Sequence, residues 1–462
     1  MNQHTTAGSE ASSANVTATG GRELWGSRFG FLMAAVGSAV GLGNMWRFPY
    51  GTAEHGGAAF VLLYLIITFA VGIPIMIAEF GIGRSTRLSP IGALRRAGGQ
   101  GWVPAGYLFV AAGFLILAYY SVIAGWVSRY AIEAILTPWP ADAGTYFTEV
   151  SGSGVAILYH LGFMALTLLI VGGGVKAGIE RVSSIAMPIL GLILVGIAVW
   201  ATTLIGADEG YRYYLTPSFE ELMSLDTIAA AASQAFFSLS LGMGAMLTFA
   251  SYLSRDTDLP VEATIVSLSD FAVAFTAGLV VFPVIFALGL QNAVSDSTIG
   301  ALFIAIPGAF VAMGAAGRIV GILFFVALFI GAITSAIALL EVVVSSVIDE
   351  WKFDRRKAAI VMGIVIALIG ILPASDINIL GAMDAVASEI FLPLGGLLLS
   401  VLVGWGPAGK DLTVYTEGTS AGIRALMSGW VWTLRVVVPP LLIIVLYKTI
   451  PNGIAAIQAI GN

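Results

Sequence analysis

About eleven stretches, each with roughly the 20 apolar residues that a helix needs to cross a bilayer, fill nearly the whole sequence. Of the 462 residues, 58% are hydrophobic and only 10% are charged, and the mean hydropathy is +0.94. Such a composition is typical of a polytopic membrane protein. Because every backbone N–H and C=O must be paired in hydrocarbon, we predict an all-α polytopic membrane protein with about 11 transmembrane helices.

The apolar stretches define the predicted spans, and the basic residues define their orientation. The spans fall at residues 30–54, 58–82, 104–135, 154–172, 179–205, 228–253, 261–290, 319–348, 358–373, 378–404 and 427–449. Loops on one side carry Arg and Lys, whereas the opposite loops (136–153, 207–227 and 291–317) are acidic with few basic residues. The basic side is normally cytoplasmic, so we expect the N-terminus in the cytoplasm and the C-terminus outside. The expected location is the plasma (inner) membrane, with many passes through the lipid bilayer.

One transmembrane domain is expected at residues 22–449, between two short tails. Residues 1–21 are polar, rich in Ser, Thr and Ala, and lack the apolar core of a signal peptide. We interpret them as a disordered cytoplasmic tail. Residues 450–462 are predicted to form an extracellular tail.

Several classes of chemistry find no support in the sequence. There is no cysteine, and the three histidines are scattered, which argues against disulfides and Cys- or His-ligated metals. No nucleophile with a base and no Gly-x-x-x-x-Gly-Lys-Ser/Thr phosphate loop is visible, so an enzyme or an ATP-driven pump is disfavoured. We expect no organic cofactor and no nucleic-acid partner. The sequence does not indicate an oligomeric state.

Two glycine-rich segments interrupt otherwise apolar spans. The first reads Gly-Ser-Ala-Val-Gly-Leu-Gly-Asn-Met-Trp-Arg-Phe-Pro at residues 37–49, and the second Ser-Leu-Gly-Met-Gly at residues 240–244. In a membrane, a broken helix survives only where it lines a cavity or a bound ion. One break opens each run of five spans, which favours a 5+5 inverted repeat, about 22–206 and 226–405, with helices 1 and 6 broken at mid-membrane and an extra helix at 427–449. The alternative is that these glycines only let helices pack closely.

A longer ordered series of residues carries a specific resemblance. It comprises Arg22, Trp25, residues 37–50, Gly56-Gly57, Gly72-Ile73-Pro74, Glu79, Gly83-Arg84, Tyr119-Tyr120, residues 236–244, Ser251-Tyr252 and Thr334-Ser335. With this series the chain resembles the neurotransmitter:sodium symporter family over residues 22–449, and within it the bacterial symporters of hydrophobic amino acids and sodium. The resemblance implies the leucine-transporter fold and transport by alternating access.

The resemblance also implies two Na⁺ ions, and the chain has the oxygen ligands that a hard cation prefers. Besides the substrate carboxylate, the ligands implied for the first ion are the Ala39 carbonyl, Asn44, Ser238 and Asp270. Those implied for the second ion are the carbonyls of Gly37, Val40 and Gly331 and the hydroxyls of Thr334 and Ser335. For these two hydroxyls, bonding back to their own helix is the alternative.

Asp270 departs from the common pattern of the family, which has Asn at this position. Chloride-dependent members have a serine one helical turn later, where this chain has Ala274. A buried carboxylate is costly unless a cation or a proton compensates it. We therefore predict that Asp270 supplies the negative charge that chloride provides in the animal relatives, so that transport is independent of chloride. The alternative is a lone Asp bonded to nearby backbone.

The expected substrate is a hydrophobic L-amino acid, aliphatic or aromatic. Monoamine carriers of the family have an Asp in the first break, where this chain has Gly41, so the substrate should bring its own carboxylate. By resemblance, this carboxylate faces Leu42, Gly43 and Tyr120 at the positive end of the outer half-helix. The other residues implied for the substrate site are Ser38, Ala39, Ile116, Phe237, Ser238, Ser240, Met243, Ser335 and Leu339. Met243 stands where the transporter that names the fold has a bulkier Phe, and a flexible Met can repack around different side chains, although Met is also common filler.

Charged and aromatic residues indicate a closure on each side of this site. Arg47 and Asp384 resemble the outer pair of the family, which closes above the substrate. The residues that resemble its inner closure are Arg22, Trp25, Tyr252 and Asp349. An Arg beside a helix break within the membrane needs a functional reason, whereas Arg22 is also explained as an ordinary cytoplasmic anchor. Glu79 is expected to accept hydrogen bonds from a broken helix. Gly178 and Pro188 predict a weak point in the fifth span, because both residues destabilise a helix.

The sequence thus predicts a sodium-coupled symporter of hydrophobic amino acids that uses two Na⁺ ions. The alternatives are an amino-acid carrier of another family that shares the fold, or an ion channel. A channel should lack closures on both sides of one site.

Overall fold

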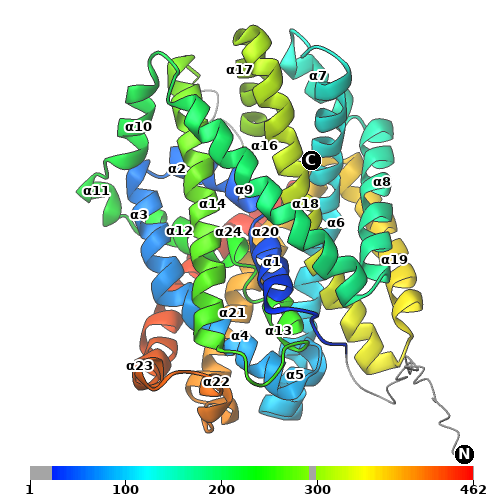
Figure 1. The fold of residues 1–462 in the computed structure, drawn as a ribbon, viewed down its shortest axis with the longest axis vertical. Helices are drawn as coiled ribbons and strands as arrows, with labels where there is room; N and C mark the ends of the chain where they lie inside the picture. Colours follow the sequence, from blue (N-terminus) through cyan, green and yellow to red (C-terminus); the bar gives the residue numbers. More distant parts are fainter. Residues whose placement is uncertain (1–22, 291–297, 461–462) are drawn as a thin grey trace, which may run out of the picture.

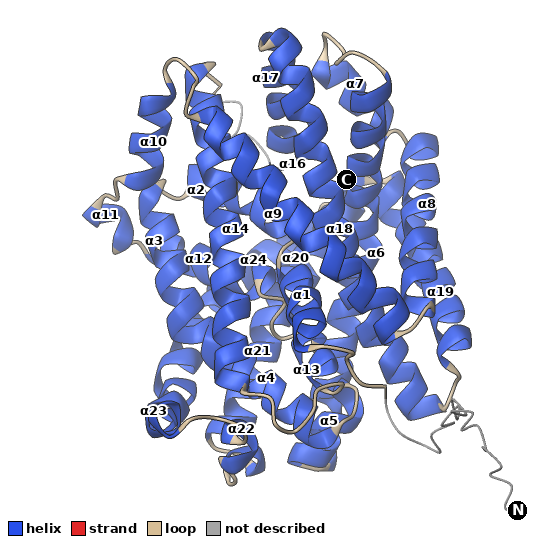
Figure 2. Ribbon diagram, in the orientation of Figure 1, coloured by secondary structure: helices blue, strands red, loops and turns tan. Residues whose placement is uncertain are grey.

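The computed structural model describes residues 23–290 and 298–460, and this part of the chain contains helices and no strand (Figure 1, Figure 2). Nine of its helices are long and apolar enough to cross a membrane, or ten when the bent pair Arg28–Ala39 and Gly43–Glu54 counts as one span. The prediction of an all-α polytopic membrane protein is therefore confirmed. The count of eleven spans is not, because the predicted sixth span consists of two short helices.

The first half of the chain contains the first break and the long helix α6. Its helices are α1 (Arg28–Ala39), η1 (Gly43–Arg47), α2 (Phe48–Glu54), α3 (Ala58–Ile67), η2 (Thr68–Gly72), α4 (Ile73–Thr86), α5 (Pro90–Gly98), η3 (Gln100–Trp102), α6 (Val103–Leu136), α7 (Ala143–Ser151), α8 (Ser153–Gly172), η4 (Val175–Glu180), α9 (Arg181–Ala201), α10 (Ala207–Leu215) and α11 (Phe219–Leu222). The segments η1, η2 and η4 are π-helical turns that continue into longer helices.

The second half contains the second break and the long helix α18. Its helices are α12 (Leu225–Ser238), α13 (Ala245–Ala250), α14 (Leu259–Ala287), α16 (Thr298–Gly300), η5 (Ala301–Ala305), α17 (Ile306–Ala312), α18 (Gly314–Trp351), α19 (Arg355–Ser375), α20 (Ile377–Val386), η6 (Ala387–Phe391), α21 (Leu392–Gly404), η7 (Pro407–Gly409), α22 (Thr413–Thr416), α23 (Ala421–Trp432), η8 (Thr433–Val437) and α24 (Val438–Gln458). Figure 1 shows α1 and α13 inside the bundle, and α1 packs against α9, α14 and α18.

The first break is shorter than the glycine-rich sequence suggests. Helix α1 continues through Ala39, Val40 adopts an extended backbone (φ −78°, ψ 108°), and the chain becomes helical again at Gly43. The two helical parts are bent by 45°. Gly41 allows a close approach inside the break, because a Cβ there would lie 2.3 Å from the Ser335 hydroxyl.

The second break covers residues 239–244, between α12 and α13. Three of its residues have a left-handed backbone, with φ values of 54° at Ser240, 77° at Gly242 and 76° at Gly244. Glycine adopts this conformation without steric cost. At Gly242 there is also no room for a side chain, since a Cβ would lie 2.2 Å from the Leu392 carbonyl oxygen. Both predicted helix breaks therefore exist.

The end of the chain differs from the prediction. The span expected at 427–449 belongs to a longer helical segment, Ala421–Gln458, and residues 450–458, expected as a tail, continue α24. Pro451, Asn452 and Gly453 are residues that often end a helix, but apolar residues follow them and α24 continues to Gln458. The predicted N-terminal tail, 1–21, and Arg22 lie outside the described residues.

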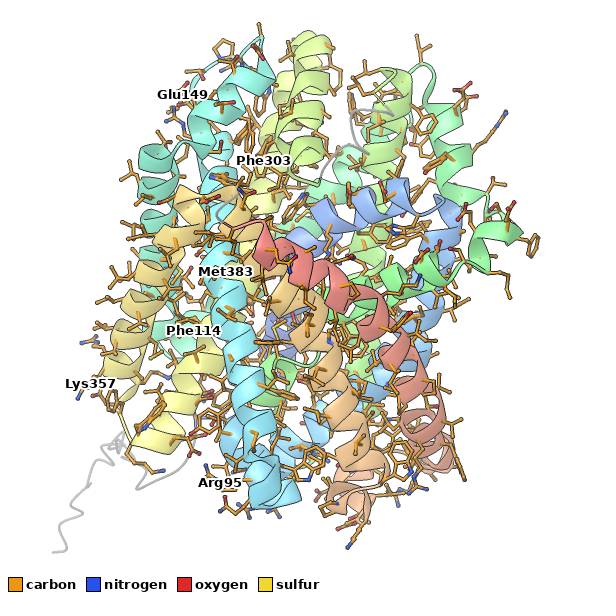
Figure 3. The ribbon with its side chains drawn as sticks, turned by 180° about the vertical axis from the view of Figure 1, so that it is seen from behind. Arg95, Phe114, Glu149, Phe303, Lys357 and Met383 are labelled. Atoms are coloured by element: carbon orange, nitrogen blue, oxygen red, sulfur yellow. The ribbon has the colours of Figure 1, made fainter. Side chains whose placement is uncertain are left out.

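Three of the charged residues that served to predict orientation lie at opposite ends of the bundle. Figure 3 shows Arg95 and Lys357 at one end and Glu149 at the other. Short helices (α7, α10, α11 and α17) occupy much of the predicted acidic loops. The predicted orientation therefore corresponds to a cytoplasmic position of the end that carries Arg95 and Lys357.

Candidate functional site

The two helix breaks contact each other directly. The Ser240 hydroxyl, in the second break, donates a hydrogen bond to the Ser38 carbonyl at the end of α1 (2.8 Å). From α12, the Gln234 amide donates to the Gly43 carbonyl (2.9 Å). The Ser38 carbonyl lies in the last turn of α1, where regular helical bonding provides no donor, whereas the Gly43 carbonyl also accepts from the Phe48 N–H. The breaks thus form one polar surface inside an apolar bundle.

A small cavity of about 20 Å³ lies between these breaks, α6 and α18. It is lined by Gly41 and by eleven of the twelve residues predicted for the substrate site: Ser38, Ala39, Gly43, Ile116, Tyr120, Phe237, Ser238, Ser240, Met243, Ser335 and Leu339. The twelfth, Leu42, is buried beside it, and its N–H donates to the Tyr120 hydroxyl (3.2 Å). The structure therefore brings the predicted substrate residues together around one cavity that is polar at the breaks and apolar elsewhere.

Asp270 lies on α14 beside the first break and has no exposed surface. Its Oδ1 accepts hydrogen bonds from the Asn44 amide (2.7 Å) and the Ser238 hydroxyl (2.8 Å), and its Oδ2 accepts one from the Tyr64 hydroxyl (2.6 Å). All three donors are neutral, and no Arg, Lys or His of the described residues forms an ion pair with this carboxylate. A buried carboxylate without a positive partner is costly, so this group of oxygens fits a small hard cation.

Tyr64 was not predicted from the sequence. It lies within a run of apolar residues on α3, Ala58–Ile67, and is fully buried. A buried phenol hydroxyl needs a hydrogen-bond partner, so its position in an apolar run was a signal that a polar group faces it. The predicted ligand Ala39 lies at the end of α1, next to Val40 in the break.

The residues predicted for the second cation site also lie together, between the end of α1 and α18. The Ser335 hydroxyl is 3.3 Å from the Gly37 carbonyl oxygen and 3.4 Å from that of Val40. The Thr334 hydroxyl is 3.1 Å from the Gly331 carbonyl oxygen and 3.0 Å from that of Ile330, four residues before it. Thr334 thus bonds back to its own helix, as the alternative interpretation held, whereas Ser335 reaches across to the broken helix.

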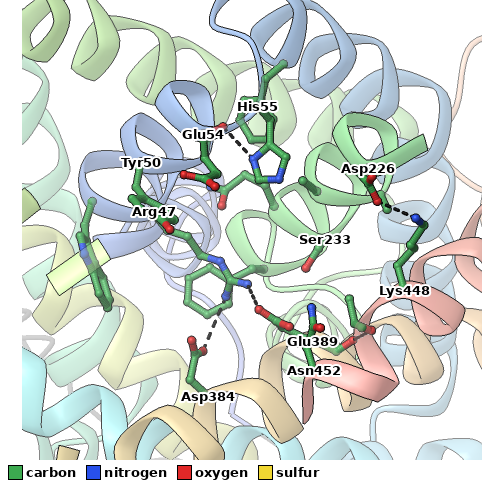
Figure 4. Close-up of a pocket in the computed structure, with 18 of the residues that line it drawn as sticks. Arg47, Tyr50, Glu54, His55, Asp226, Ser233, Asp384, Glu389, Lys448 and Asn452 are labelled. Carbon is green, nitrogen blue, oxygen red and sulfur yellow. Dashed lines mark hydrogen bonds and ion pairs between the residues drawn. The ribbon is translucent and has the colours of Figure 1, made fainter. Parts of the chain in front are cut away.

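The residues predicted for the outer closure lie together, and Figure 4 shows Arg47 between two carboxylates, those of Asp384 and Glu389. Arg47, at the end of η1, lies over the Phe237 ring, with 4.9 Å from the guanidinium carbon to the ring centroid. One guanidinium nitrogen is 3.6 Å from Asp384, as predicted, and another is 3.2 Å from Glu389, which was not predicted. Beyond this closure lies a wider cavity of about 560 Å³, which we call the vestibule.

An inner closure joins the segment before α1 to the end of the second broken helix. The Trp25 indole N–H donates to the Phe249 carbonyl (2.9 Å), and the Trp25 backbone N–H donates to the Tyr252 carbonyl (3.2 Å). The rings of Trp25 and Tyr252 meet edge to face, with 6.1 Å between their centroids. Asp349 accepts a hydrogen bond from the Ser89 N–H (2.6 Å). Arg22, which we predicted together with Asp349 for this closure, lies outside the described residues.

Charged residues that the sequence did not reveal strengthen this closure. The buried Glu341 carboxylate accepts a hydrogen bond from the Tyr252 hydroxyl and two from the Arg355 guanidinium (2.8 Å each). Arg355 also lies 3.3 Å from Glu23. Glu341 interrupts the apolar run of α18, and a carboxylate in such a run was the signal for a buried cationic partner.

The same N-terminal segment is attached to the start of the fifth span. Glu23 accepts a hydrogen bond from the Val175 N–H (2.7 Å), while Glu180 accepts from the Gly26 N–H (2.7 Å) and the Ser27 hydroxyl (2.8 Å). The weak point predicted there coincides with the π-turn η4, which contains Gly178, whereas the helix continues unbroken past Pro188.

Glu79 has the structural role that we predicted. Its carboxylate is fully buried and accepts hydrogen bonds from the N–H groups of Gly242 (2.8 Å) and Leu247 (3.1 Å). These two donors lie in the second break and in the first turn of α13, where regular helical bonding is absent. Glu79 therefore pairs backbone groups that the break leaves open.

Comparison with known proteins identifies the family to which this chain belongs. The profile of the "Sodium:neurotransmitter symporter family" matches residues 22–153 and 147–455. The uncharacterized sodium-dependent transporter YhdH of Bacillus subtilis is 35% identical over 92% of this chain and 97% of its own length. The bovine sodium-dependent neutral amino acid transporter B(0)AT2 is 30% identical over 57% of this chain and 41% of its own.

A solved structure is similar along nearly the whole chain. The crystal structure of MhsT in complex with L-phenylalanine is 40% identical, with a TM-score of 0.85, and the match covers 93% of this chain and 100% of that one. These matches remove the alternative of another family that shares the fold. The chain belongs to the sodium:neurotransmitter symporter family, and it is therefore a multi-pass membrane transporter and not an enzyme.

Proposed function

We propose that this protein imports hydrophobic L-amino acids, aliphatic and aromatic, together with two Na⁺ ions and without a requirement for chloride. The observation that carries the proposal is Asp270, a fully buried carboxylate whose described partners are all neutral. It lies beside the oxygen-rich break, where a hard cation finds suitable ligands. Because the carboxylate is fixed in the protein, it supplies the negative charge for which chloride-dependent relatives need an anion.

The cavity supports an amino acid as the substrate. At its polar end, the Leu42 N–H and the Tyr120 hydroxyl are donors for a carboxylate, close to the positive end of the outer half-helix. The carbonyls of the breaks are acceptors for an ammonium group. Ile116, Met243 and Leu339 give the rest of the cavity an apolar lining. The complex of the similar MhsT with L-phenylalanine supports an aromatic substrate.

The same geometry supports the proposal of two sites for Na⁺. The first site comprises Asn44, Ser238 and Asp270 with the Ala39 carbonyl and the substrate carboxylate, so the ion and the amino acid stabilise each other. The second site comprises the hydroxyls of Thr334 and Ser335 with carbonyls of Gly37, Val40 and Gly331. Ser335 already joins α18 to the end of α1, so an ion there would hold the broken helix against α18.

Transport proceeds by alternating access between the two closures. The outer closure contains Arg47, and the inner closure contains Trp25 and Tyr252, with the cavity between them. The ion pairs of Arg47 with Asp384 and Glu389 are partly exposed, and such pairs contribute about 0–1 kcal/mol each, so they can be broken and remade in every cycle. We place the protein in the plasma membrane with the inner closure and the N-terminus on the cytoplasmic side.

Uptake into proteoliposomes tests this function. Radiolabelled leucine and phenylalanine are offered with Na⁺ or K⁺ outside, and with chloride or gluconate as the anion. We expect accumulation that requires external Na⁺, continues in gluconate and saturates with substrate concentration. Accumulation that persists in K⁺, or that stops in gluconate, would contradict the sodium coupling or the chloride independence respectively. Flux that does not saturate would instead indicate a channel.

A further inference from the structure

Arg47 has a second carboxylate partner in addition to the predicted Asp384. The distance from Arg47 to Glu389 is 3.2 Å, shorter than the 3.6 Å to Asp384 (Figure 4). Asp384 is also engaged by the Tyr119 hydroxyl, which donates to its Oδ1 at 2.7 Å. Glu389 is therefore the more direct acceptor of the Arg47 guanidinium.

A π-turn brings both carboxylates to the same side of the tenth span. Asp384 and Glu389 are five residues apart, and in a regular α-helix such residues point about 140° away from each other. The π-turn η6 (Ala387–Phe391) lies between α20 and α21 and adds a residue to the turn. A π-turn of this kind often occurs at functional positions. Here it allows Arg47 to contact both residues.

The Glu389 carbonyl lacks its usual α-helical donor, and α24 supplies another one. In an α-helix the donor would be the N–H of residue 393, but this residue is a proline and has no N–H. The Thr449 hydroxyl of α24 donates to the Glu389 carbonyl instead (2.7 Å). Gly453, one turn further along α24, permits the close packing, because a Cβ there would lie 2.7 Å from Ile390.

The neighbouring residue of α24 reaches the opposite wall of the vestibule. The Lys448 ammonium lies 2.6 Å from the Asp226 carboxylate, in the first turn of α12 (Figure 4). Further along, α12 carries Phe237, the ring that lies under Arg47. Helix α24 is thus bonded both to the element that carries Glu389 and to the half-helix under the closure.

We propose that Glu389 is a second acceptor of Arg47 in the outer closure and that Thr449 positions it, so that the last helix of the chain sets how readily this closure opens. The inference rests on the proposed function in one respect, namely that Arg47 closes the external side. Lys448 and Asp226 add a second attachment of α24. Glu389 contacts the closure itself, whereas Thr449 acts only through Glu389.

The absence of cysteine from the whole sequence allows a direct test. Ile116 lines the cavity beneath the closure, so a single Ile116→Cys variant reports when that cavity opens. The rate of labelling by a membrane-impermeant thiol reagent is measured on intact cells in Na⁺ buffer without substrate. Glu389→Gln, Thr449→Val and Asp384→Asn are each combined with this cysteine. Thr449→Ser, which keeps the hydroxyl, is the matched control for Thr449→Val.

We expect Glu389→Gln and Thr449→Val to raise the labelling rate about threefold to tenfold, the range for loss of one partly buried charge-assisted contact. Thr449→Ser should label at the parent rate. If Asp384→Asn accelerates labelling while Glu389→Gln does not, Glu389 is not part of the closure. If Thr449→Val matches Thr449→Ser, the role of α24 is wrong. Because no substrate is present, these rates stay informative even if amino-acid uptake fails, a result that would refute only the proposed function.

Discussion

At the scale of single residues, Met243 should decide which side chains the cavity accepts. Met243 is almost fully buried and lines the apolar part of the cavity. A methionine side chain adapts its shape, whereas a rigid Phe in its place would occupy the space of an aromatic substrate. We expect Met243→Phe to lower kcat/KM for phenylalanine by about tenfold or more while leucine uptake changes less.

Competition of unlabelled phenylalanine against the uptake of labelled leucine measures which side chains the cavity accepts. Met243→Leu, which keeps the volume of the side chain, serves as the control. Equal inhibition by phenylalanine in the Phe variant and the parent would show that Met243 does not face the substrate side chain.

Asp270 should determine the affinity for sodium. Asp270→Asn keeps the shape and removes the charge that a cation needs as its partner. Removing one partner of a buried ion pair costs more than 1.4 kcal/mol, so the Na⁺ concentration for half-maximal uptake should rise by at least about tenfold. Tyr64→Phe removes one neutral donor from the Asp270 carboxylate, and it should raise the Na⁺ concentration for half-maximal uptake less than Asp270→Asn does. An unchanged sodium dependence in Asp270→Asn would contradict the cation site.

Tyr64, Glu341 and Glu389 show why single residues are the hardest part to predict. Each lies on a span that the sequence indicated correctly, but its partner lies on another helix. Spacing along one helix indicates which residues share a face and does not indicate which helix packs against that face. The predicted substrate residues came together in one cavity because the family resemblance supplied those contacts between helices.

At the scale of helices, Glu79 should control the stability of the second break. Its two carboxylate oxygens accept from Gly242 and Leu247, and a glutamine offers only one oxygen. Glu79→Gln therefore leaves one buried N–H without an acceptor, which costs about 1–3 kcal/mol. Thermal unfolding in detergent should show a lower midpoint, whereas Asp349→Asn, near the C-terminal end of α18, should change the midpoint less. A midpoint equal to that of the parent would show that the break does not depend on Glu79.

The ends of helices were predicted less well than their existence. The first break is confined to a few residues around Gly41, although the glycine-rich sequence extends to Pro49. Gly43 and Pro49 both lie within the continuous helical segment Gly43–Glu54, in which the π-turn η1 precedes the proline. Pro451 likewise lies inside α24. Glycine and proline thus indicate where a helix is weak, and tertiary packing decides whether it ends there.

At the scale of the whole molecule, the two charged ends should lie on opposite sides of the membrane. Glu149 lies at one end, and Arg95 and Lys357 lie at the other (Figure 3). Cysteines introduced singly at Glu149 and Lys357 are free of background, because the chain has none of its own. We expect an impermeant thiol reagent to label Glu149→Cys on intact cells and Lys357→Cys only after permeabilisation. The reverse pattern would invert the assigned orientation.

The membrane class and the helical fold followed from hydropathy alone, because a bilayer admits few structures. The two opposed breaks followed from glycine and polar residues within apolar spans. The attachment of α24 to the vestibule did not follow, since nothing in residues 448–453 indicates which helices they meet. Such a contact depends on how helices far apart in the sequence are arranged.

The hydrogen bonds that Glu23 and Glu180 accept join the segment before α1 to η4, and this attachment has a consequence for the hydration of that end of the bundle. The Val175 N–H opens a helix, so it has no acceptor of its own when Glu23 departs, and a water molecule must take its place. Detachment of the segment before α1 and hydration of the foot of the fifth span are consequently one thermodynamic event. A solute that withdraws water from this junction should therefore favour the attached state.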